Sequence, residues 1–530
     1  MVILLFKGYF FNIYYHILLK TEKDGKQKMK KPIFIKNAVI LTASSLILRV
    51  LGVVFKVWVA ARVGGEGMGA YQLIISVYWL FCAFSQTGVS VAVTRLCADC
   101  ISLSRDFRPV IKKAFLITFI TALFSAAVMF SFSGTISNIS IGNNSFETCF
   151  KILSLSIIPV GFSACFRGFF FAVRKASVSA FSQIFEQIIR IGISFALVVR
   201  FSKYGIVASC IALSLGDCIS ETVCAFHLYL SYRKRAKKLI CGAAPYVCGM
   251  RQVLRISFPL TAGRYISLAL RTAESIMVPK GLSKSGMGAK ASLEIFGNIK
   301  AMALPVLLFP SGFFSAISSL LVPEISAAGA KGHRLVVKEL CGRIINLTLI
   351  ISIIFACQFA FCGRQIGMLL YKTNSVGVLL CLLAPLLPLM FIDVVCDGLL
   401  KGLDCQRFSF FCGVSDSALR LLGVLILLPR YGATGFIFVM YFSNIYTAAL
   451  NITMLFKKSD CSINTTKSIF LPLCIGIIIT KGLSLVLPAL TTNNLIFICL
   501  FFSISTLAYF GGLFLTKCIS PYEIKDAVTP

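Results

Sequence analysis

Apolar residues run through this chain in long stretches, without the alternating or amphipathic patterns of soluble strands and helices. Residues 114–132 contain no charged side chain, and residues 347–362 and 495–515 read the same way. A helix needs about 20 apolar residues to cross roughly 30 Å of hydrocarbon. Because lipid cannot hydrogen-bond free backbone groups, such stretches must be helical. The pattern predicts an all-α integral membrane protein.

Along the whole chain this pattern predicts about fourteen transmembrane helices. The loops between them are too short for a sizeable domain outside the membrane. The predicted helices cover residues 37–61, 69–94, 114–133, 149–173, 177–199, 204–230, 252–279, 295–322, 344–370, 377–400, 408–429, 432–456, 468–488 and 494–516.

The first 30 residues differ from the rest of the chain. An apolar, aromatic stretch comes first and a lysine-rich one follows, which is the reverse of a signal peptide, and no small-residue cleavage site is present. An interfacial helix is one interpretation. We favour Met29 as the natural start, with residues 1–28 the product of an upstream start assignment.

Lysine and arginine concentrate in alternate loops. One set of loops holds 30 of them and the other set holds 8, residues inside the predicted spans being left out. Because cytoplasmic loops carry the excess of positive charge, the first set and both termini are predicted to be cytoplasmic. This distribution, and not binding to nucleic acid, accounts for the net charge of +32.

The chain also repeats itself at a nearly constant offset. Leu41-Thr42-Ala43 recurs as Leu260-Thr261-Ala262, displaced by 219 positions, and Gly168 matches Gly398 at 230. An even number of helices per repeat makes the halves parallel, related by an axis along the membrane normal. The predicted organisation is an N-terminal extension (1–30), a first six-helix lobe (31–231), a cytoplasmic linker (232–251), a second six-helix lobe (252–457), and two C-terminal helices with a tail (458–530).

Basic residues lie inside the first helix of each lobe. An ionisable residue in a spanning helix costs about 3 kcal/mol on insertion scales, so each is a candidate functional residue. Arg49 and Lys56 are seven residues apart, on one helix face, and so are Arg264 and Arg271. If both stripes face the space between the lobes, they form a cationic cage suited to a diphosphate. The alternatives are snorkelling of Arg49 or Lys56 and neutralisation of Arg271 by Glu274.

Acidic residues lie inside the spans as well. Glu186 with Arg190, and Asp416 with Arg420, repeat the same i, i+4 spacing at an offset of 230. We favour structural ion pairs here, with a shared gate as the alternative. Two acids one turn apart repel each other, so a buried one can take up a proton or a cation. Candidates for such ion coupling are Asp217, beside Glu221, and the pair Asp393 and Asp397.

Motifs of soluble enzymes are missing from the sequence. It contains no Walker loop, no G-x-S-x-G and no H-E-x-x-H. Most of the 21 cysteines are scattered through apolar runs, and the three histidines are dispersed. We therefore expect a protein that is not an enzyme and that holds no cofactor and no metal.

The stretch from Lys36 to Leu96 carries a family resemblance. It opens KNAVILTASSLILRVLG, continues AARVGGEGMGAYQL and ends TGVSVAVTRL; the phrase from Gly65 to Tyr71 is its most specific part. The chain resembles the polysaccharide biosynthesis and stage V sporulation protein B branch of the multidrug/oligosaccharidyl-lipid/polysaccharide exporter superfamily. The resemblance continues through Gly168, the Tyr204-Gly205-Ile206 turn and Tyr431-Gly432-Ala433.

That resemblance implies a specific function. The family has fourteen helices in two six-helix lobes, and its members are thought to move undecaprenyl-diphosphate-linked sugars, including peptidoglycan precursors, across the bacterial cytoplasmic membrane. The stretch Arg49-Val50-Leu51-Gly52 is similar to the first helix of lipid II flippases, where the arginine lines the cavity. Lys56 lies at or beside a second arginine of those flippases, and keeps the charge but not the planar fork.

Three interpretations follow from these observations. The leading one is a monomeric flippase for lipid-linked oligosaccharide that works by alternating access. The second is a cation-coupled multidrug or small-molecule exporter of the same superfamily, although the first-lobe stripe is basic. The third is a membrane-embedded glycosyltransferase or polymerase, which the short, acid-poor outer loops disfavour.

Overall fold

The computed structural model describes residues 31–103, 105–238, 250–330, 332–490, 493–516 and 518. Every secondary-structure element in these residues is helical, so the predicted all-α membrane fold is confirmed. The first lobe contains α2 (Lys31–Ser102), α3 (Arg108–Ser131), α4 (Ser133–Ile141), η1 (Asn144–Phe146), α5 (Glu147–Ala172), α6 (Ala176–Phe201), η2 (Ser202–Tyr204) and α7 (Ile206–Lys238).

The second lobe repeats this arrangement, and two C-terminal helices follow it. The second lobe contains α8 (Met250–Lys284), α9 (Ala289–Phe296), η3 (Gly297–Ala303), α10 (Leu304–Leu307), α11 (Ser311–Ala330), α12 (Arg334–Tyr371), α13 (Asn374–Leu383), η4 (Ala384–Leu386), α14 (Leu387–Gly402) and α15 (Gln406–Ser459). The C-terminal part contains η5 (Thr466–Phe470), α16 (Leu471–Leu490) and α17 (Asn494–Leu515). The predicted extension 1–30, most of the linker and most of the tail lie outside the described residues.

Two of the long helices divide at a glycine. Gly64 in α2 has φ 72° and Gly432 in α15 has φ 55°, which are backbone conformations that glycine adopts without the penalty of a Cβ. Each glycine separates two membrane-length halves. These are the positions at which the sequence predicts the first and second helices of the first lobe, and the last two of the second lobe, to be separate.

The number of spans agrees with the prediction. Nine helices of the described residues are long and apolar enough to cross a membrane. Two of these, α2 and α15, supply two spans each because of their kinks. Three further spans are α6, α8 and the segment from α9 to α11, which carry charges in mid-helix or are interrupted. Together they make fourteen.

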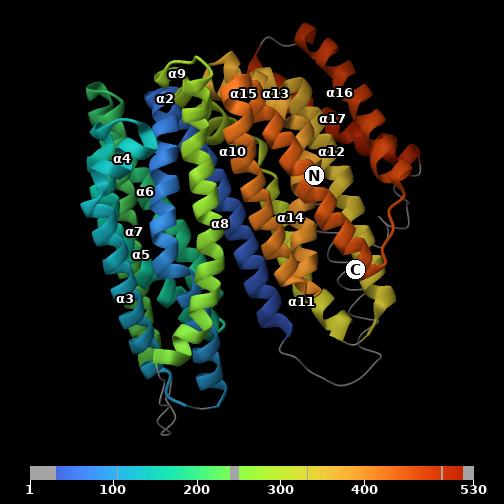
Figure 1. The fold of residues 1–530 in the computed structure, drawn as a ribbon. Helices are drawn as coiled ribbons and strands as arrows, with labels where there is room; N and C mark the ends of the chain where they lie inside the picture. Colours follow the sequence, from blue (N-terminus) through green and yellow to red (C-terminus); the bar gives the residue numbers. More distant parts are fainter. Residues whose placement is uncertain are drawn as a thin grey trace.

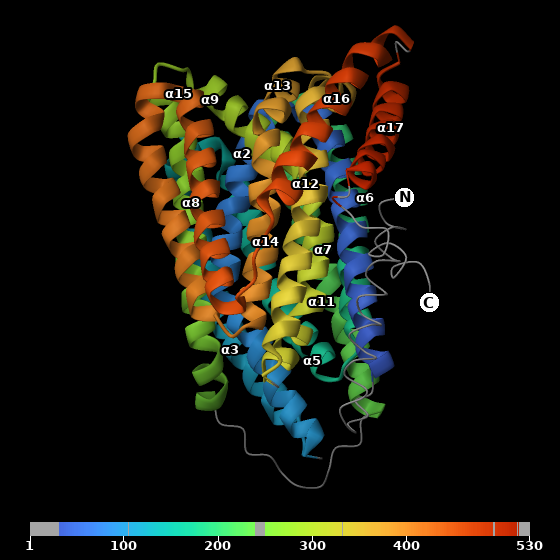
Figure 2. The same cartoon turned by 90° about the vertical axis from the view of Figure 1, so that its right-hand side faces the viewer.

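Helix contacts fall into two groups, one for each lobe. In the first lobe α5 packs against α2, α3 and α7, and in the second lobe α14 packs against α11, α12 and α15. Figure 1 shows α3 to α7 on one side of the molecule and α11 to α15 on the other, with α8 between them. Both views place α16 and α17 at the outer edge of the second lobe, where they pack against α12 (Figures 1 and 2).

The predicted helix 295–322 is interrupted in the structure. It begins earlier, at Ala289, widens into a π-helical segment at η3, and breaks between α10 and α11. Pro310 lies in this break, and because proline has no backbone N–H it cannot extend the ladder of the preceding turn. The break leaves the carbonyl of Leu308 at a helix end, close to the first helix of the other lobe.

Glycines permit the two lobes to touch. Gly65 and Gly69 in α2 lie against Gly297 in η3, so that a Cβ on Gly297 would overlap the carbonyl oxygen of Gly65. Close backbone approach through small residues is the usual way in which helices associate in membranes. This contact joins the second half of α2 to the second lobe.

We expect Gly297→Val to destabilise the protein by about 1–3 kcal/mol, because an added side chain forces these backbones apart. Gly192→Val in α6 is the matched control, since no atom lies within 4 Å of the site of its Cβ. The measurement is the thermal unfolding midpoint in detergent. Equal midpoints for the two variants would show that this contact does not hold the lobes together.

Candidate functional site

The two lobes meet along α2 and α8. The backbone N–H of Gly88 donates a hydrogen bond to Thr261 Oγ1 at 3.1 Å, and Thr272 Oγ1 donates to the carbonyl oxygen of Ser76 at 3.2 Å. The α8 helix also packs against α15, so it contacts both lobes. The candidate site is built around this interface.

Arg49 reaches from the first lobe to the second. Its Nη1 donates to Ser311 Oγ at 2.6 Å and to the carbonyl oxygen of Leu308 at 3.3 Å, in the break between α10 and α11. The side chain passes over Gly312, where any Cβ would overlap it. Both acceptors are uncharged, so neither of them neutralises the positive charge of the guanidinium at the lobe interface.

The other three predicted cations have no such partner. Lys56 is half-buried in α2, and Arg264 and Arg271 are exposed on α8. Among the described residues, none of the three has a hydrogen bond or an ion pair within 4 Å. Glu274 does not neutralise Arg271 by an ion pair, because its carboxylate contacts Lys300 Nζ at 2.9 Å. No contact joins the four predicted cations to one another, so the cage stays a prediction.

The first lobe holds a buried network of charges. Arg190 is its centre: Nη2 lies 2.7 Å from Glu186 and 3.2 Å from Glu221, and Nε lies 2.9 Å from Asp217. Arg167 Nη2 contacts the other oxygen of Glu186 at 2.8 Å. These residues come from α5, α6 and α7, so the network ties three helices together.

This network is larger than the pair that the sequence suggests. Arg190 and Glu186 form the expected i, i+4 pair, but Asp217 is bound by the same arginine and also accepts a hydrogen bond from Tyr71 at 2.6 Å. Arg167 and Tyr71 are missed by sequence reasoning. A charged residue and a tyrosine hydroxyl inside apolar runs can be recognised in the sequence. Spacing along one helix, however, does not predict which residues of another helix they contact.

The second lobe has a sparser arrangement. Arg420 Nε lies 3.2 Å from Asp416, which also accepts a hydrogen bond from Ser443. Lys300, in the π-helical segment η3, binds Glu274 and lies 5.6 Å from the ring centroid of Phe436. The Glu274–Lys300 pair joins α8 to η3 inside the same lobe.

The remaining predicted acids have separate partners. Asp393 accepts a hydrogen bond from Asn451 at 2.7 Å, and Asp397 pairs with Lys401 on the same helix. Asp393 therefore has a neutral partner, whereas Asp217 and Asp397 each face a cation. In the described residues no group of three or more histidine, cysteine or acidic side chains is arranged to hold a metal.

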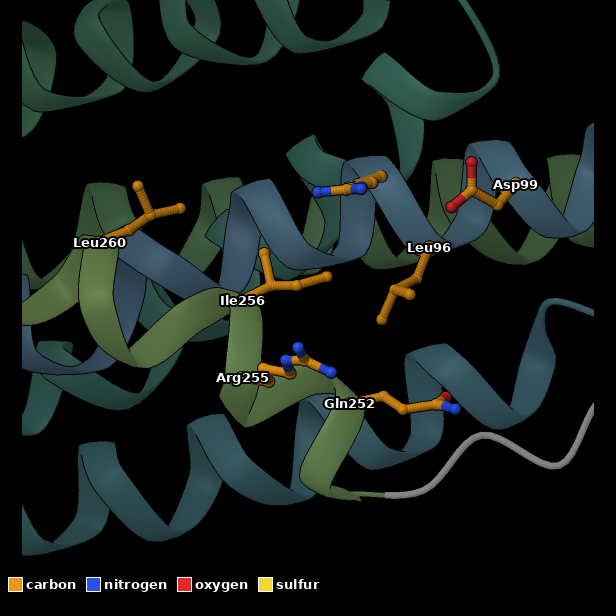
Figure 3. A pocket seen from close by; sticks show the side chains of 7 residues that line it. Leu96, Asp99, Gln252, Arg255, Ile256 and Leu260 are labelled. Carbon is orange, nitrogen blue, oxygen red and sulfur yellow. The ribbon is translucent and has the colours of Figure 1, made fainter. Parts of the chain in front are cut away.

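A cavity opens between the lobes where α2 ends and α8 begins. Its volume is about 690 Å³. Figure 3 shows side chains of both helices around it. The lining residues are Arg95, Leu96 and Asp99 of α2 and Gln252, Arg255, Ile256 and Leu260 of α8.

Residues 34–328 match the sequence profile of a family described as polysaccharide biosynthesis protein. The chain belongs to this family. The match covers more than half of the chain, including all of the first lobe's described helices from α3 to α7 and the α2–α8 interface. The resemblance seen in the sequence from Lys36 to Leu96 is thereby confirmed.

Two known proteins are similar to the chain over most of its length. Stage V sporulation protein B of Bacillus subtilis (strain 168) is 23% identical over 423 residues, which are 77% of this chain and 80% of that protein. A lipid II flippase MurJ in an inward closed conformation superposes with a TM-score of 0.67 at 15% identity, covering 89% of this chain and 98% of that one.

A second solved structure has a similar fold. An inward-facing multidrug resistance MATE family transporter of the MOP superfamily has a TM-score of 0.61 at 13% identity, covering 80% of this chain and 99% of the other. The chain therefore has the fold of MOP-superfamily transporters and is a multi-pass membrane protein. The two solved structures are titled as a flippase and as a transporter.

We expect Arg190→Gln to destabilise the first lobe by about 3–5 kcal/mol, because it leaves buried carboxylates without their cation. Arg200→Gln, at the exposed end of the same helix, is the matched control. Adding Glu221→Gln to the Arg190 variant removes a carboxylate whose ion pair was with Arg190, so it should recover part of the loss. Thermal unfolding in detergent measures all three, and an Arg190 variant as stable as the control would show that the network is not structural.

Proposed function

We propose that this protein is a flippase that moves undecaprenyl-diphosphate-linked oligosaccharide or peptidoglycan precursor across the cytoplasmic membrane by alternating access. The observation that carries this proposal is Arg49, a charged side chain inside a spanning helix that contacts the opposite lobe through uncharged acceptors. The similarity to a lipid II flippase, in fold over 89% of the chain, supports the same cargo.

A diphosphate needs cationic partners when it leaves water. Arginine presents a planar fork that can grip two phosphate oxygens at once. An unneutralised arginine in a spanning helix is costly to insert, and a functional role explains why it is there. Because its present acceptors are neutral, Arg49 can exchange them for a diphosphate with a gain in charge interaction. Lys56, Arg264 and Arg271 are proposed to supply further positive charge to the same anion.

The acidic residues are assigned to two roles. The Glu186–Arg190 and Asp416–Arg420 pairs lie within single lobes and are proposed to hold each lobe as a rigid unit during the transition. Ion coupling is proposed for Asp217 and Asp393, with Asp397 less suited because its partner Lys401 lies one turn away on an exposed helix end. In the first lobe three carboxylates face two guanidiniums, which leaves room for one proton or one cation.

The alternative function is a cation-coupled exporter of small molecules. The acid-rich network of the first lobe favours it, because a cationic drug needs a carboxylate. Arg190 contacts all three of these carboxylates, however, and Arg167 contacts one of them. Arg264 and Arg271, which are exposed on the α8 helix, are proposed to repel a cationic drug.

The setting of the proposed transport follows from the loops. Their positive-charge bias supports a cytoplasmic location of both termini. We propose that the protein acts as a monomer in the bacterial cytoplasmic membrane, because each of its two lobes supplies one wall of the path. Its partners are then the bilayer and the lipid-linked glycan.

The decisive experiment is a flipping assay in proteoliposomes with fluorescent lipid II. A charge-assisted hydrogen bond is worth about 1.5–3 kcal/mol, so Arg49→Ala should slow flipping by roughly 10- to 100-fold. Arg49→Lys keeps the charge but not the planar fork, so its flipping rate should lie between those of Arg49→Ala and of the unaltered protein. Arg62→Ala, exposed at the end of the same helix segment, is the matched control.

Parallel samples decide the cargo. A lipid-linked glycan with unrelated sugars tests whether the sugar matters, and a cationic dye tests the exporter alternative. Export of the dye without flipping of either lipid would overturn the proposed function. Equal flipping by the Arg49→Ala and Arg62→Ala variants would remove Arg49 from the substrate path.

A further inference from the structure

The cavity between α2 and α8 lies at one end of their interface, beside the C-terminal end of α2 and the N-terminal end of α8. Its α2 residues fall in the last two turns of that helix, and its α8 residues lie within the first three turns of that one. The adjoining loops, residues 95–113 and 232–251, belong to the lysine- and arginine-rich set. This end of the interface is therefore the predicted cytoplasmic one.

The polar part of the cavity carries positive charge that no ion pair neutralises in the part of the chain that the structure describes. Arg95 and Arg255 line it from opposite lobes, and both are exposed. Neither forms an ion pair or hydrogen bond with any residue that the structure describes. Asp99 is four residues from Arg95, a spacing at which the two can pair on a helix, yet no such pair is formed.

The remaining lining is mostly apolar. Leu96, Ile256 and Leu260 complete the cavity, with Gln252 as a further hydrogen-bonding group. Figure 3 shows the Arg255 side chain extending into the gap between α8 and α2, on the side where Leu96 lies. A ligand that fits both the cationic and the apolar lining residues has an anionic headgroup next to a hydrocarbon chain. Two arginines and one aspartate give the polar part a net charge of +1, which favours an anion.

We propose that this cavity binds the phosphate-bearing headgroup of a membrane lipid from the predicted cytoplasmic leaflet. Arginine is the side chain best suited to phosphate oxygens, because its planar fork can bind two of them at once. Two lipids offer this chemistry: an isoprenoid diphosphate, which is the cargo class of the proposed function, and a resident anionic phospholipid. The first case rests on the proposed function, and the second does not.

The site has a consequence for motion because its two arginines belong to different lobes. A phosphate held by Arg95 and Arg255 joins the ends of α2 and α8, and separation of these ends breaks one of the two contacts. Binding there therefore favours the arrangement in which the ends are close together. Asp99 opposes it by repulsion, so its removal should strengthen binding.

The test is lipid binding to the full-length protein in nanodiscs of phosphatidylcholine. Three probes are titrated: undecaprenyl diphosphate, phosphatidylglycerol and undecaprenol, which has the same chain but no phosphate. The variants are Arg95→Gln, Arg255→Gln and Asp99→Asn. Arg251→Gln is the matched control, because Arg251 is exposed on the same end of α8 but does not line the cavity.

We expect Arg95→Gln and Arg255→Gln each to weaken binding of a phosphate-bearing probe by about tenfold or more, as the loss of one charge-assisted contact implies. Asp99→Asn should tighten it a few-fold and Arg251→Gln should leave it unchanged. Because Arg95→Gln should weaken binding and Asp99→Asn should tighten it, the pair distinguishes an effect on binding from damage to the fold. The probe that responds, the diphosphate or phosphatidylglycerol, identifies the source of the phosphate.

Two results would overturn the site. One is unchanged phosphate-probe binding in both arginine variants, and the other is an equal loss for undecaprenol, which would mean that only the hydrocarbon chain binds. Flipping of lipid II by the unaltered protein is measured on the same preparation. If the unaltered protein flips lipid II but both arginine variants bind the phosphate probes as well as it does, this site is rejected and the proposed function stands. If the arginine variants lose binding but the unaltered protein does not flip lipid II, the site stands and the proposed function is rejected.

Discussion

The lipid solvent imposes the constraint on which the whole structure depends, because it cannot pair backbone groups or charges. Helices satisfy the backbone, and irregular backbone in the membrane is tolerated only where protein covers it. The break between α10 and α11 illustrates this: its Leu308 carbonyl oxygen accepts hydrogen bonds from the Ser311 side chain and from Arg49 of the other lobe. The same contact that covers an irregular segment thus brings a cation to the lobe interface.

Charges inside the lobes obey the same constraint. Arg190 and Arg167 hold three carboxylates together in the first lobe, and Lys300 and Arg420 each hold one in the second. Breaking such a buried pair costs far more than the pair itself contributes. Each lobe is therefore expected to move as a unit, with change concentrated at the interface, where glycines and single hydrogen bonds make the contacts.

Within the described helices, cations without an ion pair occur on both α2 and α8, the two helices that form this interface. Arg264 and Arg271 are exposed on α8, and Arg95 and Arg255 line the cavity at its end. Cations on these two helices are what the proposed transport of an anionic lipid requires. Membership in the polysaccharide biosynthesis protein family agrees with such a cargo.

Much of the fold was determined by the sequence alone. Hydrophobic run length specifies fourteen helices, because span length is a property of each segment by itself, and the repeated i, i+4 pairs are local for the same reason. Partners across helices were decided only by the tertiary structure. Spacing shows Glu221 as the neighbour of Asp217, whereas the cation that binds Asp217, Arg190, comes from another helix; Glu274 looked like a partner of Arg271, yet it binds Lys300. Spacing along one helix determines which residues share a face, whereas packing of helices distant in sequence determines what that face meets.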